Sequence, residues 1–203
     1  PADNMIDKYI YEKIMMEIIE PTLMGMEKEG RKYKGCLYCG LMITNNINGI
    51  LEPYVIEFNA RFGDPETQAV LPLIKSDFLK LLIDSADENI SNYNLEIHNK
   101  YSCCVILASK GYPDKYETNK MIKGLKEKSN DVFVFHSGTK YSEDRKKVLT
   151  NGGRVLSVVA LNEISMKEAI SKCYNEIGKI EFDNMYFRKD IGSKYKISDN
   201  ISN

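Results

Sequence analysis

Apolar residues repeat at helical spacing through the first stretch of the chain, which predicts a helix capped by Asp3 or Asn4. Pro21 interrupts this pattern, because proline lacks the backbone N–H that a helix interior needs. A second helical piece is expected to run to about Glu29, and Gly30 supplies the residue that ends it. The pattern therefore predicts two helical pieces in succession.

Two apolar runs at 36–44 and 50–59 then predict β-strands. The Asn48-Gly49 pair between them is a strong signal for a tight turn, so the two runs predict a β-hairpin. Further along, Ser76 can cap a helix over 77–87.

The second half of the chain is richer in strand-like runs. A polar, Asn-rich stretch over 88–100 reads as a linker. Three β-type runs follow at 103–108, 132–136 and 154–161. Ser165 and Glu168 then form a capping box that opens a helix through about residue 178. The apolar face expected for this helix consists of Ala169, Ile170, Cys173, Tyr174 and Ile177.

These patterns divide the chain into two α+β parts. The first is predicted to cover residues 1–97, and the second, a small β-rich α+β domain, residues 98–203. The hydrophobic fraction of 43% and the charged fraction of 28% are those of an ordinary globular protein. The net charge of −1 argues against a nucleic-acid partner. No apolar run spans a bilayer and no signal peptide is visible, so a cytoplasmic protein without a membrane partner is expected.

The five cysteines do not suggest a disulfide framework, since their number is odd. Cys36 and Cys39 match C-x-x-C, a spacing found in redox pairs and in half-sites for zinc. No second pair with zinc-ligand spacing follows, and the two lie within an apolar, strand-like run. We interpret them as small packing residues.

The candidate chemistry lies at the end of the second predicted strand. Side chains alternate along a strand, so Glu57 and Asn59 are expected to share one face with Val55. A carboxylate and an amide oxygen on a rigid support suit Mg²⁺, which binds few protein oxygens and leaves positions for water and phosphate. The other face is apolar and is expected to be core. It consists of Tyr54, Ile56 and Phe58.

Arg61, Asp64 and Glu66 follow this strand closely. The planar guanidinium of Arg61 could hold a phosphate or a carboxylate. From spacing alone, an interpretation without a bound metal or phosphate stays open. Glu57 and Asn59 could lie on an exposed strand face, and Arg61 could form an ion pair with Asp64 or Glu66.

The segment Glu57-Phe-Asn-Ala-Arg-Phe-Gly-Asp-Pro-Glu-Thr-Gln68 resembles, almost letter for letter, the signature of the phosphoribosylamine–glycine ligase family, also called glycinamide ribonucleotide synthetases, of the ATP-grasp superfamily. Five further segments resemble family motifs in the same order. They are 35–43, 111–113, 136–140, 151–156 and 186–192.

The resemblance implies the C-terminal part of an ATP-grasp domain followed by the family's C-terminal domain. Pro1-Ala2 is similar to a segment near the middle of the family's enzymes. The chain is thus expected to be a C-terminal half whose partner, the missing N-terminal half, carries the glycine-rich ATP lid. Alone it is expected to be inactive.

In the family, ATP phosphorylates glycine to glycyl phosphate, and 5-phosphoribosylamine attacks it to give glycinamide ribonucleotide in purine biosynthesis. The resemblance implies ATP and Mg²⁺ (or Mn²⁺) as cofactors, with Glu57 and Asn59 as metal ligands and Arg61 as the catalytic charge clamp. Asp64 and Glu66 would orient substrate. Many ATP-grasp enzymes add a carboxylate on the neighbouring strand, but 37–43 has none. The alternative is a non-catalytic ATP-grasp remnant that serves as a binding or assembly module.

Overall fold

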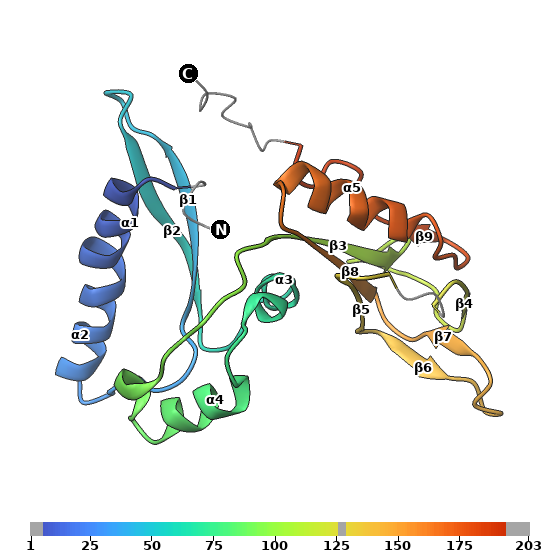
Figure 1. The fold of residues 1–203 in the computed structure, drawn as a ribbon, viewed down its shortest axis with the longest axis horizontal. Coiled ribbons are helices and arrows are strands. Elements are labelled where there is room, and N and C mark those ends of the chain that lie inside the picture. The colour runs from blue at the N-terminus through green and yellow to red at the C-terminus, as the bar shows by residue number, and fades with distance from the viewer. Residues whose placement is uncertain (1–5, 126–128, 194–203) are drawn as a thin grey trace. The chain divides into compact units, whose positions relative to one another are not determined.

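The computed structural model describes residues 6–125 and 129–193, which belong to two compact units (Figure 1). The first unit holds the residues up to Asp64 together with Ile74–His98. The second unit holds Pro65–Leu73 and the residues from Asn99 onward. The domain border predicted between residues 97 and 98 stays a prediction.

The first unit begins with a continuous run of helix. Helix α1 (Lys8–Ile14) is capped by Asp7, whose side-chain oxygen accepts a hydrogen bond of 2.8 Å from the backbone N–H of Ile10. The predicted caps Asp3 and Asn4 lie outside the described residues.

Pro21 does not stop the helix, as the sequence predicted, but lies in the first turn of helix α2 (Glu20–Lys28). A π-helical stretch, η2 (Met15–Ile19), joins α1 to α2. The first turn of a helix tolerates proline, because its N–H groups have no intrahelical partners there. Gly30 ends the helix as predicted: its φ is 73°, and its N–H donates to the carbonyl of Glu27.

The predicted hairpin is present. Strands β1 (Tyr38–Asn45) and β2 (Leu51–Asn59) pair antiparallel. In the turn, the side-chain oxygen of Asn46 accepts from the backbone N–H groups of Asn48 and Ile50. Gly49 has a φ of 76°, which glycine adopts without steric cost. Local turn chemistry therefore fixes this hairpin.

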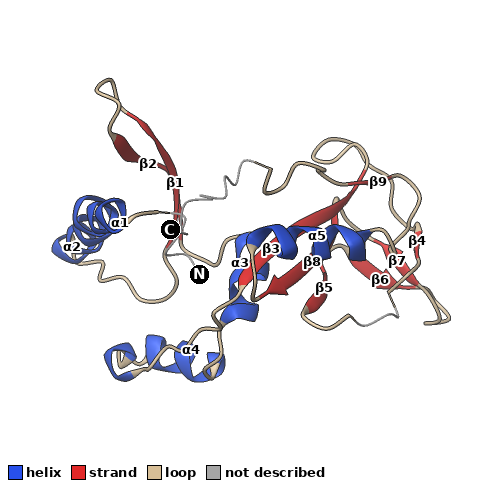
Figure 2. Ribbon diagram, turned by 45° about the horizontal axis from the view of Figure 1, so that its top comes forward, coloured by secondary structure: helices blue, strands red, loops and turns tan. Residues whose placement is uncertain are grey.

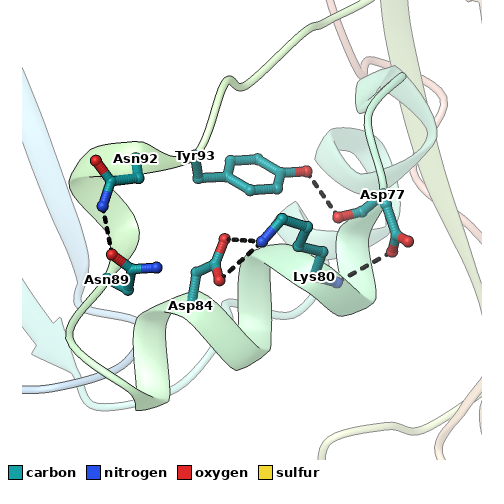
Figure 3. A network of polar contacts seen from close by, with 6 residues as sticks. All are labelled: Asp77, Lys80, Asp84, Asn89, Asn92 and Tyr93. Atoms are coloured by element: carbon teal, nitrogen blue, oxygen red, sulfur yellow. Dashed lines mark hydrogen bonds and ion pairs between the residues drawn. The ribbon is translucent and has the colours of Figure 1, made fainter.

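A polar network organises helix α4 (Phe78–Ala86) and the 3₁₀ turn η4 (Ile90–Asn92) (Figure 3). Asp77, not the predicted Ser76, caps α4 by accepting from the N–H of Lys80. The ammonium of Lys80 donates to both oxygens of the buried Asp84, at 3.0 and 2.8 Å. The Tyr93 hydroxyl donates to the carbonyl of Asp77 at 2.7 Å. The stretch predicted as a linker is thus partly structured.

Ser76 takes a different role from the predicted one. Its hydroxyl accepts from the N–H of Glu96 at 2.7 Å and lies 3.2 Å from the carbonyl of the same residue. An isolated β-bridge between Ile74 and Ile97 reinforces this contact. Asp77 is the N-cap of α4 because the Ser76 side chain is already hydrogen-bonded to the backbone of Glu96.

Glu88 pairs with the ammonium groups of both Lys32 and Lys34. Hydrogen bonds from Lys32 and then Lys34 lower the pKa of Glu88 from 4.5 to about 2. Because the folded pKa lies below the unfolded value, this contact stabilises fully above pH 4.5 and is lost as the pH falls through about 2. Carboxyl titration of Glu88 by NMR should give a midpoint near 2. Replacing both lysines by alanine should raise it, and a midpoint near 4.5 in the unaltered chain would contradict the contact.

The second unit is built on a four-stranded antiparallel sheet in the order β5-β8-β3-β9 (Figures 1 and 2). The same unit contains a separate three-stranded sheet in the order β4-β7-β6. The strand bounds are β3 (Tyr101–Ser109), β4 (Met121–Ile122), β5 (Val132–His136), β6 (Thr139–Tyr141), β7 (Val148–Thr150), β8 (Arg154–Asn162) and β9 (Met185–Tyr186). The three predicted strand runs correspond to β3, β5 and β8.

Helix α5 (Met166–Ile177) lies along β3 and β8 and covers one face of the larger sheet (Figure 2). Its cap is the predicted one: the Ser165 side chain accepts from the N–H of Glu168 at 3.1 Å. Ala169, Cys173 and Ile177 are buried in the core, as the predicted apolar face requires.

Helix α3 (Glu66–Val70) and the 3₁₀ turn η3 (Leu71–Leu73) also belong to the second unit, and α3 contacts β3 and β8. The amide nitrogen of Gln68 on α3 lies 3.5 Å from the hydroxyl of Ser157 on β8. The signature segment therefore passes from one unit to the other between Asp64 and Pro65. In the described part of the chain, no helix has both the length and the apolar character needed to cross a membrane.

Candidate functional site

Glu57 and Asn59 lie at the end of β2 on the same face. The Asn59 amide nitrogen donates a hydrogen bond of 2.8 Å to Oε1 of Glu57. This bond uses the amide nitrogen and one carboxylate oxygen, so Oδ1 of Asn59 and Oε2 of Glu57 are left to act as ligand atoms. Both groups lie near solvent. A carboxylate and an amide oxygen held together on a strand form a donor set that fits Mg²⁺.

The other predicted site residues follow along the chain. Arg61 is exposed, and its Nη1 donates to the carbonyl of Phe62 at 2.9 Å. Asp64 is exposed and is the last residue of this segment in the first unit. Glu66 lies in the first turn of α3, which belongs to the second unit. The first unit thus carries four of the five predicted site residues. Of these, Glu57 and Asn59 contact each other through a hydrogen bond.

The apolar face predicted as core is exposed. Tyr54, Ile56 and Phe58 expose 51%, 62% and 42% of their surface. Among the described residues of the first unit, Ile10 and Ile14 are the buried hydrophobic side chains. The prediction failed because burial depends on what packs over a face, and alternation along a strand does not supply that layer.

A β-bulge that the sequence pattern did not predict lies directly before Glu57. Gly40 pairs with Glu57, but the next residue, Leu41, pairs with Val55, so Ile56 is extra. Strict alternation therefore ends at Ile56. The glycine inside a strand-like run was the available signal, since such glycines often mark bulges or close approaches.

The structure supports the interpretation of the C-x-x-C pair as packing residues. The Cys36 and Cys39 thiols are free, and burial raises the pKa of each, which disfavours the thiolate that redox or metal chemistry needs. Among the side chains that the structure describes, no group of three or more His, Cys, Asp and Glu could hold a metal. In the second unit, Nδ1 of His136 lies 3.0 Å from the Thr139 hydroxyl, which is a hydrogen-bonding role.

Comparison with known proteins assigns the chain to a family. The family model of the phosphoribosylglycinamide synthetase ATP-grasp (A) domain matches residues 2–67, and that of the C domain matches residues 102–194. The chain belongs to the phosphoribosylglycinamide synthetase family. The resemblance found in the sequence motifs is confirmed, as is the α+β architecture that joins part of an ATP-grasp domain to the C domain.

Relatives of this synthetase family match along nearly the whole chain. A phosphoribosylamine–glycine ligase from Caldanaerobacter subterraneus subsp. tengcongensis is 46% identical over 94% of the chain. One from Fusobacterium nucleatum is 41% identical over 93%. The crystal structure of the Thermotoga maritima phosphoribosylamine–glycine ligase superposes with a TM-score of 0.77 at 34% identity, covering 92% of this chain and 44% of that one. The chain spans 43% of the length of each of the first two relatives.

Proposed function

We propose that this chain supplies one wall of the active site of an ATP-dependent ligase that joins glycine to 5-phosphoribosylamine. The observation that carries the proposal is the hydrogen-bonded Glu57–Asn59 pair at the end of β2, in a chain of the phosphoribosylglycinamide synthetase family. The product would be glycinamide ribonucleotide, formed through glycyl phosphate, with ADP and phosphate released.

Glu57 and Asn59 would hold Mg²⁺ through their side-chain oxygens. When bound, Mg²⁺ neutralises charge on the ATP phosphates during phosphoryl transfer. Before the metal arrives, the bond from the Asn59 amide to the Glu57 carboxylate, 2.8 Å long, keeps both oxygen donors on one face of the strand. Little rearrangement is then needed on binding, because the donor atoms are already together.

Arg61 is proposed as the charge clamp of the site. Its guanidinium is exposed and uses Nη1 for the neighbouring carbonyl of Phe62, so other N–H groups of the fork can meet a phosphate or an acyl phosphate. Asp64 and Glu66 are proposed to orient substrate. Their order directly behind Arg61 supports this role, which stays a prediction.

Turnover is proposed to need the remaining part of such a ligase. The relatives are more than twice as long as the matched region. The side chains of Tyr54, Ile56 and Phe58 are apolar and exposed, which suits burial against further protein. The 203-residue chain by itself is therefore expected to release no ADP. The alternative, a non-catalytic binding or assembly module, needs neither an exposed carboxylate–amide pair nor an adjacent arginine.

The experiment is a substrate-omission assay on a protein that contains this chain together with the rest of a ligase. ADP should form when ATP, Mg²⁺, glycine and 5-phosphoribosylamine are all present, and omission of either organic substrate should reduce it to background. ADP formation that ignores glycine would contradict the proposed substrates. A complete lack of ADP formation by the folded protein would favour the non-catalytic alternative.

A further inference from the structure

Gly40 of β1 lies directly opposite Glu57 of β2. Residues that face each other across an antiparallel pair project on the same side of the sheet. Gly40 is therefore on the face that carries Glu57 and Asn59. Tyr38 is on this face too, since it lies opposite Asn59.

The backbone does not explain why a glycine occupies position 40. Glycine inside a strand weakens the strand, because it loses more conformational freedom and brings no side chain to pack. Gly40 is not among the glycines with positive φ, so its conformation is open to other residues. The reason must come from the surroundings of the position.

Space supplies that reason. A Cβ atom placed on Gly40 would lie 3.2 Å from Cγ of Glu57 and 3.7 Å from the carbonyl oxygen of Glu57. The first contact is closer than ordinary van der Waals distance, so the Glu57 side chain would have to shift. A side chain at position 40 would therefore crowd Cγ of Glu57 and displace it by a few tenths of an ångström, which moves the carboxylate that Cγ carries.

The bulge acts on the same residue. Ile56 is extra in the pairing, immediately before Glu57, and bulges bend a strand and redirect its side chains. The bulge, directly before Glu57, sets the direction of the strand there. Gly40, on the neighbouring strand opposite Glu57, leaves room for the Glu57 side chain. Two separate features of the hairpin therefore affect the position of the Glu57 carboxylate.

We propose that Gly40 is a positioning residue for the Glu57–Asn59 pair: it leaves open the space in which the Glu57 side chain lies against Asn59. The inference rests on the proposed function, because the exact place of this carboxylate matters only if the pair holds the metal. Gly40 itself offers no ligand atom and acts through Glu57.

The test compares Gly40→Ala and Gly40→Val in a ligase that contains this chain. Gly25→Ala is the matched control, because a Cβ at Gly25 meets nothing within 4 Å. Crystal structures of the metal-free variants should show the Asn59 Nδ2 to Glu57 Oε1 distance lengthened beyond a hydrogen bond in Gly40→Val. The Mg²⁺ concentration for half-maximal ADP formation should rise about tenfold or more in Gly40→Val, and less in Gly40→Ala. The KM for glycine should stay unchanged.

The outcomes separate the positioning role from the proposed function. Gly40→Val with an intact Glu57–Asn59 hydrogen bond and an unchanged Mg²⁺ requirement would overturn the positioning role, while a parallel loss of activity in Glu57→Gln would leave the function standing. If Glu57→Gln keeps full Mg²⁺-dependent activity, the metal assignment itself fails. Should Gly40→Val not fold, Gly40→Ala decides by the same two measurements.

Discussion

Replacing Glu57 by glutamine should lower kcat/KM for ADP formation by about 10²- to 10³-fold in a ligase that contains this chain. Glutamine keeps the shape of glutamate, and its amide oxygen can still accept the hydrogen bond from Asn59. The substitution therefore removes the negative charge and leaves the geometry of the pair. The Glu57 carboxylate is the only negative charge in the proposed ligand pair, so its loss weakens Mg²⁺ binding, whereas a strand residue on a solvated face needs no charge.

The matched control is Glu29→Gln, which makes the same change from glutamate to glutamine outside the candidate site. Glu29 is an exposed glutamate at the C-cap of α2 and is not among the candidate site residues. Its substitution should leave kcat/KM within about twofold of the unaltered protein, since exposed surface changes have small effects. Steady-state ADP release measured over a range of Mg²⁺ concentrations compares the two variants. Equal activities for Glu57→Gln and Glu29→Gln would remove Glu57 from the metal site.

Ile177→Ala should destabilise the second unit by about 2–5 kcal/mol. Ile177, the last residue of α5, exposes only 2% of its surface and belongs to the core cluster formed by the helix and the larger sheet. Truncation to alanine removes buried methyl groups and leaves a cavity that the surrounding strands fill only in part. The measurement is amide hydrogen exchange along β8, which reports opening of this unit.

Ile164→Ala provides the same chemical change at an exposed position. Ile164 exposes 80% of its surface and lies just before α5. Its side chain leaves water only slightly, so the expected change in the free energy of opening is within about 0.5 kcal/mol. Similar exchange rates in the two variants would show that α5 does not close the core as described.

The elements that the sequence predicted well are those fixed by local chemistry. The turn at Asn48-Gly49 needs only a residue that tolerates positive φ, and the cap at Ser165 needs only a hydroxyl three residues before an orphan N–H. Both depend on neighbours along the chain. The Glu57–Asn59 pair is similar, because a spacing of two residues on a strand is enough to bring the side chains together.

What the sequence could not predict depends on contacts between distant segments. The cap of α4 shifts from Ser76 to Asp77 because Ser76 binds the returning chain at Glu96. The bulge at Ile56 exists only in the register of β2 against β1. The exposure of Phe58 reflects which layers pack over the hairpin, and no pattern within the strand contains that information. The role of Gly40 is likewise visible only once its partner across the sheet is known.

We propose that Glu57 and Asn59 hold the metal of a nucleotide in a ligase active site. Anomalous scattering from crystals of a ligase that contains this chain, grown with Mn²⁺ and ADP, tests it most directly. An anomalous peak is expected within coordination distance, about 2.0–2.3 Å, of side-chain oxygens from both Glu57 and Asn59. A nucleotide-bound Mn²⁺ that takes no ligand from either residue would contradict it.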